Sequence, residues 1–597
     1  MRSYELRIKF NYIALFFISA GLLFLKVHMK KFLSLAPLRL VLVLTILFVQ
    51  FSFSASRKPV KAKNGMVVSA DPLASKVGME ILKKGGNAVD AAVAVGFALA
   101  VTYPAAGNIG GGGFMNIRFA DRRCFTIDYR EKAPGAATHD MYLDSAGNFI
   151  SDKSTFGYLA AGVPGAVGGM LLGLEKYGTM NRKQVITPAY NFAAKGFPLL
   201  PDLAEDLNWG RKTFEKFSGS KKYFVSNDSA YNDGELWKQT DLGKTLKRII
   251  DKGRDGFYKG ETADLIVAEM KRGGGLISHY DLENYQATIR EPLKGTYRGY
   301  EIIAQPPVSS GGTALLQLLN ILEGYDLKSY GHNSAKTVHR YIEAMRRVYA
   351  DRAEHLGDPD FYNVPVQWLT SKEYANERRA TIDTMKASES KNISHGKPPV
   401  HESVQTTHYS VVDKWGNCVS VTTTLNGGFG SFVAVDGAGF LLNNEMDDFS
   451  AKPGVPNIYG ALGNVANEIQ PNKRMLSSMT PTIVVKDGKP FMVIGTPGGT
   501  TIITTVMQVI CNVIDFGMNI QEAIDAPRIH HQWSPDVTYY EKHGLSFDTV
   551  EKLEAMGQKL QQRRGTSGLA EGIIIDSEKG FFYGASDSRG YGEAVGY

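Results

Sequence analysis

One predicted helix restricts the fold of this chain more than any other segment. Residues 87–101 read NAVDAAVAVGFALAV, a run of small side chains that is apolar on nearly every side. Such a helix needs neighbours on all of its faces, because an exposed apolar surface is unfavourable in water. Asp90 and the length of the run argue against a membrane span. The sequence therefore predicts a helix that is buried between other layers.

The last third of the chain has the pattern of paired strands. The segments THYSVVD and NCVSVTTTLN flank a KWG turn, and PTIVVKDGKPFMVIG reads as a second hairpin with Asp487 and Gly488 in its turn. Residues 160–400 are mostly helical in pattern. A chain of 597 residues, 43% of them hydrophobic, is long enough for one or two compact domains. These patterns predict a layered α/β fold in which sheets can stack.

Residues 1–55 have the composition of a leader with a signal peptide. Two short apolar runs, residues 11–25 and 40–51, each follow basic residues, and SFSAS then supplies small side chains for cleavage. We expect translation to start at Met29 and the exported protein to be periplasmic or secreted. Most of the net charge of +7 lies in this leader, and no basic stripe with interleaved aromatic residues follows it. We therefore expect no nucleic-acid partner, and membrane contact only through an uncleaved leader.

Neither a metal site nor a nucleotide site is indicated. The three cysteines, Cys124, Cys418 and Cys511, are far apart, and no HExxH or CxxC spacing occurs. Four consecutive glycines at 110–113 suggest a phosphate loop, but they come after a helix and no lysine and Ser/Thr pair follows. A tight turn or a close backbone approach explains them better. We expect no cofactor and no metal.

The segment QTTHYSVVD, which begins at Gln405, allows two interpretations. Threonine suits a strand, so strand propensity alone could explain Thr406 and Thr407. Alternatively, cleavage of the Gln405–Thr406 bond would give Thr406 a free α-amino group, which can act as the base for its own hydroxyl. The polar stretch at residues 386–404 would leave room for such a break.

Two further groups of residues also have an ordinary and a chemical explanation. Gly498 and Gly499 stand between a predicted strand and a predicted helix, where backbone N–H groups can stabilise an oxyanion, although such pairs also form simple turns. RMLSSMTP and NNEMDDFS contain serines and acidic residues that, taken alone, are typical of caps and loops. Their order within one segment favours the chemical explanation.

These motifs together resemble the γ-glutamyltranspeptidase family. TTHYSVVD, TTTLN, LLNNEMDDFSAKPGVPN, PNKRMLSSMTPTIV, GTPGGT and APRIHHQW follow one another as in that family, after DYREKAP, AGVPGAVGG, PPVSSGG and ADRAEHLGDPDF and before YGASDSR. The resemblance implies an N-terminal nucleophile hydrolase with a four-layer αββα sandwich. It also implies a self-cleaving precursor, whose large subunit (residues 56–405) and small subunit (residues 406–597) form the sandwich jointly as a heterodimer.

The resemblance further implies a reaction and its residues. A γ-glutamyl group would pass from glutathione or another γ-glutamyl amide to the enzyme, and then to water or to an acceptor amino acid or peptide. The resemblance implies that Thr406 is the nucleophile, that Thr424 orients it, and that Gly498 and Gly499 form the oxyanion hole. Arg130, Ser477 and Ser478 would bind the α-carboxylate of the substrate, and Asn426, Glu445 and Asp448 would bind its α-amino group. Tyr459 would cover the site from a lid loop.

Two other functions remain open from the sequence. A cephalosporin-type acylase of the same superfamily would keep the nucleophile and the oxyanion donors but would lose part of the zwitterion-binding set, all of which is present here. An exported binding protein that is never cleaved would keep the pocket and remain one polypeptide. His530 and His531 look like packed structural residues, and we assign them no catalytic role.

Overall fold

The computed structural model describes residues 56–226, 230–394, 407–452, 458 and 465–597. The predicted leader, the predicted cleavage site at Gln405 and Thr406, and the predicted lid residue Tyr459 lie outside these described residues. Ser56–Tyr597 forms one compact unit. None of the described helices combines the length and the apolar character that a membrane crossing requires.

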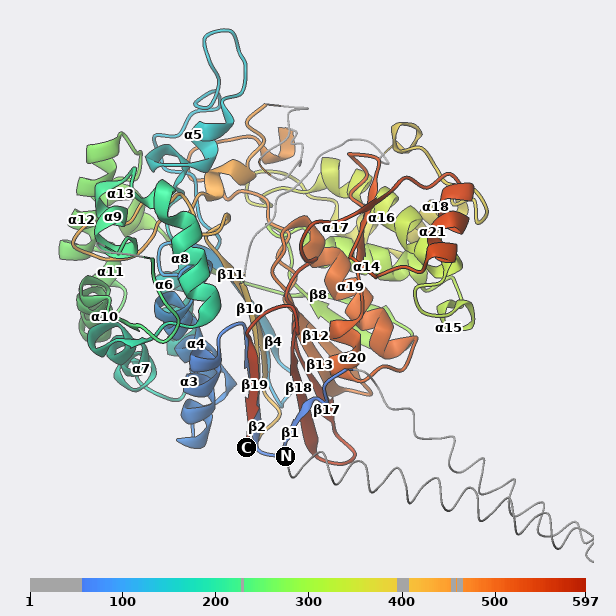
Figure 1. The fold of residues 1–597 in the computed structure, drawn as a ribbon, viewed down its shortest axis with the longest axis horizontal. Helices are drawn as coiled ribbons and strands as arrows, with labels where there is room; N and C mark the ends of the chain where they lie inside the picture. Colours follow the sequence, from blue (N-terminus) through green and yellow to red (C-terminus); the bar gives the residue numbers. More distant parts are fainter. Residues whose placement is uncertain (1–55, 227–229, 395–406, 453–457, 459–464) are drawn as a thin grey trace, which may run out of the picture. The chain divides into compact units, whose positions relative to one another are not determined.

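Two stacked seven-stranded sheets occupy the centre of this unit in the described part of the chain (Figure 1). All strand pairings within them are antiparallel. In spatial order, one sheet contains β19 (Glu593–Gly596), β2 (Gly65–Ser69), β10 (Thr407–Asp413), β11 (Cys418–Thr424), β3 (Gly112–Arg118), β4 (Cys124–Asp128) and β7 (Thr288–Arg290). The other contains β1 (Val60–Ala62), β18 (Phe581–Ser586), β17 (Glu571–Asp576), β13 (Lys489–Gly495), β12 (Thr482–Lys486), β9 (Tyr300–Ala304) and β8 (Leu293–Tyr297).

Helices cover the outer face of each sheet, as the two groups of helices in Figure 1 show. One layer contains α3 (Pro72–Lys83), α4 (Ala88–Thr102), α6 (Ala166–Tyr177), α7 (Arg182–Lys195) and α10 (Thr240–Lys252). The opposite layer contains α14 (Gly311–Leu322), α16 (Ala335–His355), α18 (Lys372–Ala380), α19 (Thr500–Ile514) and α20 (Ile520–Asp525). The αββα sandwich is therefore confirmed, and each sheet contains strands from both sides of residue 405.

Further helices and strands complete the described chain. They are α5 (Ser151–Thr155), α8 (Pro201–Phe214), α9 (Ser218–Phe224), α11 (Asp255–Tyr258), α12 (Gly260–Gly273), α13 (His279–Asn284), α15 (Leu327–Tyr330), α17 (Val366–Leu369), α21 (Phe547–Ala555), β5 (Phe197–Pro198), β6 (Leu236–Trp237), β14 (Ile529–His530), β15 (Thr538–Tyr540), β16 (Leu560–Gln562), and the 3-10 helices η1 (Tyr158–Ala160), η2 (Ser390–Asn392), η3 (Glu445–Asp448) and η4 (Val465–Asn467).

The strands at the sheet centre alternate between two cores. Val67 and Val411 pack with the helices α3 and α4, whereas Met66, Val68 and Val412 pack against the second sheet. This period of two is the geometry of a strand that is buried on both faces. The two predicted hairpins are confirmed as β10–β11 and β12–β13. In the second hairpin, Asp487 and Gly488 have φ of 50° and 73°, which suits a tight turn between twisted strands.

The predicted small-residue helix is confirmed as α4, and every one of its residues is buried. Asn87 caps its N-terminus by accepting from the backbone N–H groups of Val89 and Asp90, while the Asp90 carboxylate accepts from Asn87 N at 2.8 Å. Asp90 also accepts from the backbone N–H groups of Thr179 and Met180. Four backbone or side-chain donors thus explain how an acidic residue is tolerated in a fully buried helix.

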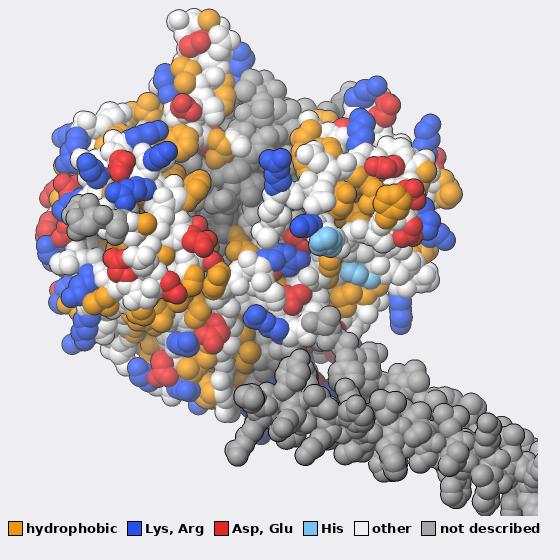
Figure 2. Space-filling view, viewed as in Figure 1, with side chains coloured by type: hydrophobic (Ala, Val, Ile, Leu, Met, Phe, Trp, Pro, Cys, Tyr) orange, Lys and Arg blue, Asp and Glu red, His pale blue; other side chains and the backbone are white. Residues whose placement is uncertain are grey.

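Charged side chains of both signs are interspersed over the face of the molecule in Figure 2. The coloured, described residues of that face show no continuous basic stripe. The described part of this face therefore has no continuous positive surface to which a polyanion could bind.

Candidate active site

The strand β10 begins at Thr407, directly after the predicted nucleophile. It lies between β2 and β11 in the sheet, and Thr407 is paired with Thr423. The predicted orienting residue, Thr424, ends β11, and its Oγ1 accepts from Asn426 N at 2.7 Å. The structure therefore places Thr424 beside the head of β10, while Thr406 itself lies outside the described residues.

Asn426 connects the end of β11, through hydrogen bonds, to the segment that contains Glu445 and Asp448. Its backbone has a left-handed φ of 71°, and its Nδ2 donates to the carbonyl of Asn444 at 3.0 Å. Gly427 N donates to Asn444 Oδ1 at 2.8 Å. These bonds fix the start of η3, which contains Glu445 and Asp448.

Arg130 forms the centre of a buried charge cluster. Its Nη1 contacts Glu445 Oε2, its Nη2 donates to Asp448 Oδ2 at 2.5 Å, and its Nη1 lies 3.5 Å from Glu131 Oε2. Only 1% of the Arg130 side chain is exposed. The structure thus brings together the predicted carboxylate-binding residue and two of the predicted amino-binding residues, and it pairs them with one another.

Burial opposes charge throughout this cluster. It acts to lower the pKa of Arg130, but the nearby Glu445 and Asp448 carboxylates outweigh it and hold that pKa above its ordinary value. Burial raises the pKa of Glu131 to about 8, although Arg130 opposes the rise, and it also raises the pKa of Glu445 well above its ordinary value. Glu131 was not singled out from the sequence, although it follows Arg130 directly in DYREKAP, which is the only signal that could have pointed to it.

The serine pair lies beside the Arg130 guanidinium. Nε and Nη2 of Arg130 donate to the carbonyls of Met475 and Leu476, at 3.2 and 3.0 Å. Ser477 and Ser478 follow at once, and both are buried. Ser478 Oγ has no hydrogen-bond partner within the described ranges.

The motif PPVSSGG, to which the sequence assigned no role, holds the serine segment in place. Ser310 N donates to the carbonyl of Ser477 at 2.7 Å, and Ser477 N donates to the carbonyl of Val308 at 3.1 Å. A Cβ at Gly311 would overlap the carbonyl of Met479. The motif therefore acts as a backbone clamp, which its residue types alone do not reveal.

Gly498 and Gly499, the predicted oxyanion hole, have backbone conformations that favour glycine. Their φ values are 128° and 56°, which L side chains rarely adopt. They directly precede α19, and neither backbone N–H donates to an acceptor in the described part of the chain. Two free N–H groups at a helix N-terminus, together with the helix dipole, favour a negative charge.

The head of β10 lies against the strand that leads to these glycines. The imidazole of His408 packs on the backbone of Gly495, so closely that a Cβ there would overlap the ring. Gly495 ends β13, three residues before Gly498. His408, the second residue of β10, and the strand end that leads to Gly498 and Gly499 therefore lie against one another.

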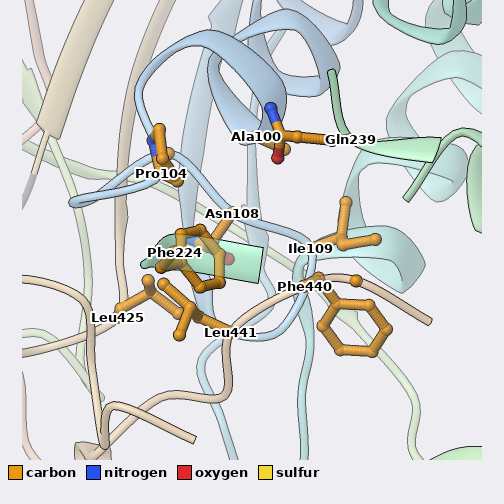
Figure 3. Close-up of a pocket in the computed structure, with 11 residues that line it drawn as sticks. Ala100, Pro104, Asn108, Ile109, Phe224, Gln239, Leu425, Phe440 and Leu441 are labelled. Atoms are coloured by element: carbon orange, nitrogen blue, oxygen red, sulfur yellow. The ribbon is translucent and has the colours of Figure 1, made fainter. Parts of the chain in front are cut away.

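The run of glycines at 110–113 is confirmed as a close backbone approach. A Cβ at Gly111 would overlap the carbonyl of Thr424, and a Cβ at Gly113 would overlap that of Thr422. A cavity of about 10 Å³ lies beside the run, between Asn108, Leu425 and their neighbours (Figure 3). It has room for about one water molecule and none for a phosphate group.

Three histidines near the site are buried and neutral. Burial lowers the pKa of His408 to about 3, that of His530 to about 3 and that of His531 to about 4. His530 Nδ1 lies 3.0 Å from Thr504 Oγ1, and His531 Nδ1 accepts from Trp533 N at 3.0 Å. These contacts are those of packed structural side chains.

Comparisons with known proteins agree with this geometry. A family described as gamma-glutamyltranspeptidase matches residues 74–597. A glutathione hydrolase proenzyme of Pseudomonas sp. (strain A14) is 52% identical over 554 residues, which cover 91% of this chain and 96% of the relative. The solved structure of a cephalosporin acylase from Bacillus halodurans has a TM-score of 0.82 and 30% identity, covering 92% of this chain and 98% of that chain. A chain of Helicobacter pylori γ-glutamyltranspeptidase has a TM-score of 0.55 and 46% identity, covering 58% of this chain and 97% of its own length.

Proposed function

Because this chain belongs to the γ-glutamyltranspeptidase family, we propose that it is the precursor of a γ-glutamyltransferase and glutathione hydrolase with Thr406 as its nucleophile. Its αββα fold is that of the N-terminal nucleophile hydrolases. The relatives with a proenzyme name, and the solved chain that spans only part of this sequence, support a precursor that is cleaved into two polypeptides.

The buried cluster of Arg130, Glu445 and Asp448 carries this proposal. A γ-glutamyl group has an α-carboxylate and an α-ammonium group on one carbon atom. The substrate carboxylate would replace the carboxylates of Glu445 and Asp448 as the partner of the Arg130 guanidinium. The substrate ammonium group would then pair with Glu445 and Asp448. Each buried charge would then keep a partner of opposite sign. An acyl group without those charges would separate the Arg130 guanidinium from the carboxylates of Glu445 and Asp448 without offering them new partners. Unpaired charges are unfavourable in a buried site.

Maturation and turnover would use the same groups. The Thr406 hydroxyl attacks the Gln405 carbonyl, and the C–N bond breaks as the amide becomes an ester, which frees the α-amino group of Thr406. Water then hydrolyses the ester and releases the Thr406 hydroxyl and the Gln405 carboxylate. In turnover, that amino group accepts the hydroxyl proton while Oγ1 attacks the γ-carbonyl carbon. The N–H groups of Gly498 and Gly499 would stabilise the oxyanion. The amine leaves with a proton, and water or an acceptor amine then removes the γ-glutamyl group from the ester.

Residues 56–405 would form the large subunit and residues 406–597 the small subunit of a heterodimer. The Helicobacter pylori chain covers 58% of this chain, which is close to the share of residues 56–405. The leader at residues 1–55, with Met29 as its proposed start, would direct the protein to the periplasm or the medium. Ser477 and Ser478 would assist Arg130, Asn426 would assist the acidic pair, and Tyr459 would belong to a covering loop.

Mass spectrometry and a matched pair of donors test the proposal. The parent chain should give two polypeptides and should hydrolyse γ-glutamyl-p-nitroanilide, whereas Thr406→Ala should stay as one inert polypeptide. Glutaryl-p-nitroanilide, which lacks only the α-amino group, should be a far poorer donor. Equal turnover of the two anilides would favour an acylase instead. An uncut and inactive parent chain with an intact fold would favour a binding protein.

A further inference from the structure

A second cavity opens at the oxyanion glycines, apart from the charge cluster. Its volume is about 500 Å³, and Gly498 forms part of its wall. Asp206, Trp209, Phe429 and Arg563 also line it, whereas no residue of the Arg130 cluster does. A group bound there would therefore lie beside the reacting carbonyl without occupying the place proposed for the γ-glutamyl end.

The side of the cavity that carries Arg563 is held firmly to the oxyanion glycines. Arg563 directly follows β16, and its backbone N–H donates to the carbonyl of Tyr540 at 2.8 Å. Leu569 N, further along the same loop, donates to Thr496 Oγ1 at 2.9 Å. The backbone of Gly568 packs on Gly498, since a Cβ on Gly498 would lie 3.1 Å from Gly568 Cα.

The opposite side is fixed as well. Phe429 N donates to the carbonyl of Ala105 at 2.9 Å. Trp209 lies on α8, where its ring centroid is 6.2 Å from that of Phe432. Even so, Trp209 is 73% exposed, which is unusual for the largest aromatic residue. The cavity is thus preformed and offers an aromatic surface to a ligand.

The cavity also carries two opposite charges that the protein leaves unpaired. Within the described ranges, neither the Arg563 guanidinium nor the Asp206 carboxylate has a hydrogen-bond or ion-pair partner in its own chain, and both are half-buried. Burial lowers the pKa of Arg563, although Glu541 opposes the change. Burial, together with repulsion by Asp202 and Glu205, raises the pKa of Asp206 to about 6. Partly desolvated charges without partners are typical of a ligand site rather than of a structural ion pair.

We propose that this cavity binds the leaving group of the donor and the acceptor of the γ-glutamyl group, and that Arg563 pairs with their free carboxylate. This inference rests on the proposed function. The oxyanion hole holds the carbonyl oxygen, so the scissile nitrogen and everything attached to it extend from Gly498 into the adjoining cavity. Trp209 and Phe429 provide an apolar surface for the acceptor side chain. Asp206 favours neutral and cationic acceptors over acidic ones, because a second carboxylate near it would be repelled.

The occupant is accordingly an amino acid or short peptide with a free C-terminal carboxylate and a side chain that is not acidic. In glutathione, this carboxylate belongs to the glycine of the leaving cysteinylglycine. In γ-glutamyl-p-nitroanilide, the leaving group has no carboxylate. The two donors therefore share the γ-glutamyl group and differ at the end that Arg563 would recognise.

The test compares Arg563→Gln with the parent on both donors. The variant should lose roughly tenfold in kcat/KM for glutathione hydrolysis, as expected for one lost charge-assisted hydrogen bond. Its hydrolysis of γ-glutamyl-p-nitroanilide should stay within about twofold of the parent, by the same reasoning. Arg564→Gln is the matched control, since Arg564 is the exposed neighbour and does not line the cavity. It should leave both donors unchanged.

Acceptors provide the second measurement. With the anilide as donor, the parent should prefer glycylglycine to glycylglycinamide, and Arg563→Gln should lose that preference. With the anilide as donor, Asp206→Asn should raise the transfer to aspartate relative to glycine by several-fold. Equal losses on both donors, or an unchanged preference for the free carboxylate, would overturn the assignment. If the parent turned over neither donor, the proposed function would fail, and calorimetric binding of glycylglycine against its amide would still decide the role of the cavity.

Discussion

Replacing Arg130 with lysine separates charge from geometry in the proposed γ-glutamyl site. Lysine keeps the positive charge that Glu445 and Asp448 require, but its single ammonium group cannot form the planar fork that binds a carboxylate through two nitrogens. The variant also loses the bonds from the guanidinium to the carbonyls of Met475 and Leu476. We therefore expect Arg130→Lys to fold and mature but to bind the substrate α-carboxylate poorly.

The size of the effect follows from these contacts. One charge-assisted hydrogen bond contributes about 1.5–3 kcal/mol, so its loss lowers kcat/KM for a γ-glutamyl donor by roughly 10- to 100-fold. Arg130→Met would instead leave the buried carboxyl groups without a cation and would destabilise the fold by about 3–5 kcal/mol. The lysine variant is the sharper test, because it leaves the number of charges in the cluster unchanged.

The assay uses two donors that differ only in the α-carboxylate, γ-glutamyl-p-nitroanilide and 4-aminobutyryl-p-nitroanilide. The parent should strongly prefer the first, and Arg130→Lys should lose most of that preference while turning over the second donor almost as the parent does. Denaturing electrophoresis should show both polypeptides for each protein, which excludes a maturation defect. A variant that slows both donors by the same factor would refute the assignment of Arg130 to the carboxylate.

Three further predictions concern other parts of the molecule. Gly498→Ala should lower kcat by roughly 100-fold or more with little change in KM, measured on the anilide, because alanine disfavours a φ of 128° and shifts an oxyanion donor. Burial acts to raise the pKa of Glu343, but the positive charge of Arg346 and the other nearby donors outweigh it, and the pKa falls to about 2. Glu343 therefore contributes about 3 kcal/mol of stability above about pH 4.5 that is lost as the pH falls toward 2, and Glu343→Gln should narrow the difference between the melting temperatures at pH 7 and pH 3. Asn87→Ala should lower the stability by about 1 kcal/mol in urea unfolding, since it removes the cap of α4.

Much of the fold could be predicted because its signals are local. The small-residue helix could be predicted without knowledge of its neighbours, because its composition already required burial on all sides. The β12–β13 hairpin was visible from Asp487 and Gly488, whose backbone conformation depends on their own residue types. The glycines at 110–113 were predicted to form a tight turn or to approach other backbone closely, but only the structure shows that Gly111 and Gly113 lie against β11.

The candidate site was predictable as a set of residues and not as a set of contacts. Arg130 and Asp448 are separated by 318 positions, and no local pattern states that they form an ion pair. The same holds for Glu131, whose unusual pKa arises from burial against residues far along the chain. The cavity with Arg563 and Asp206 was missed for this reason as well, because its two charges belong to elements that only the tertiary fold brings together.

The position of β10 explains how a chain could be cut beside its nucleophile without losing its structure. β10 is hydrogen-bonded to β2 on one side and to β11 on the other, and β11 is bonded in turn to β3. A break before Thr406 would therefore release one terminal amine, while β10, which follows it, stays paired on both edges with segments from either side of the break. Because these ladders and the cores on both faces of the sheet remain intact, cleavage at Gln405–Thr406 would change the chemistry at one residue and leave the free energy of the sandwich almost unchanged. Melting temperatures of the mature parent and of the uncut Thr406→Ala chain should accordingly differ by only a few degrees, and a collapse of the cut form would show that the peptide bond itself holds the sheets together.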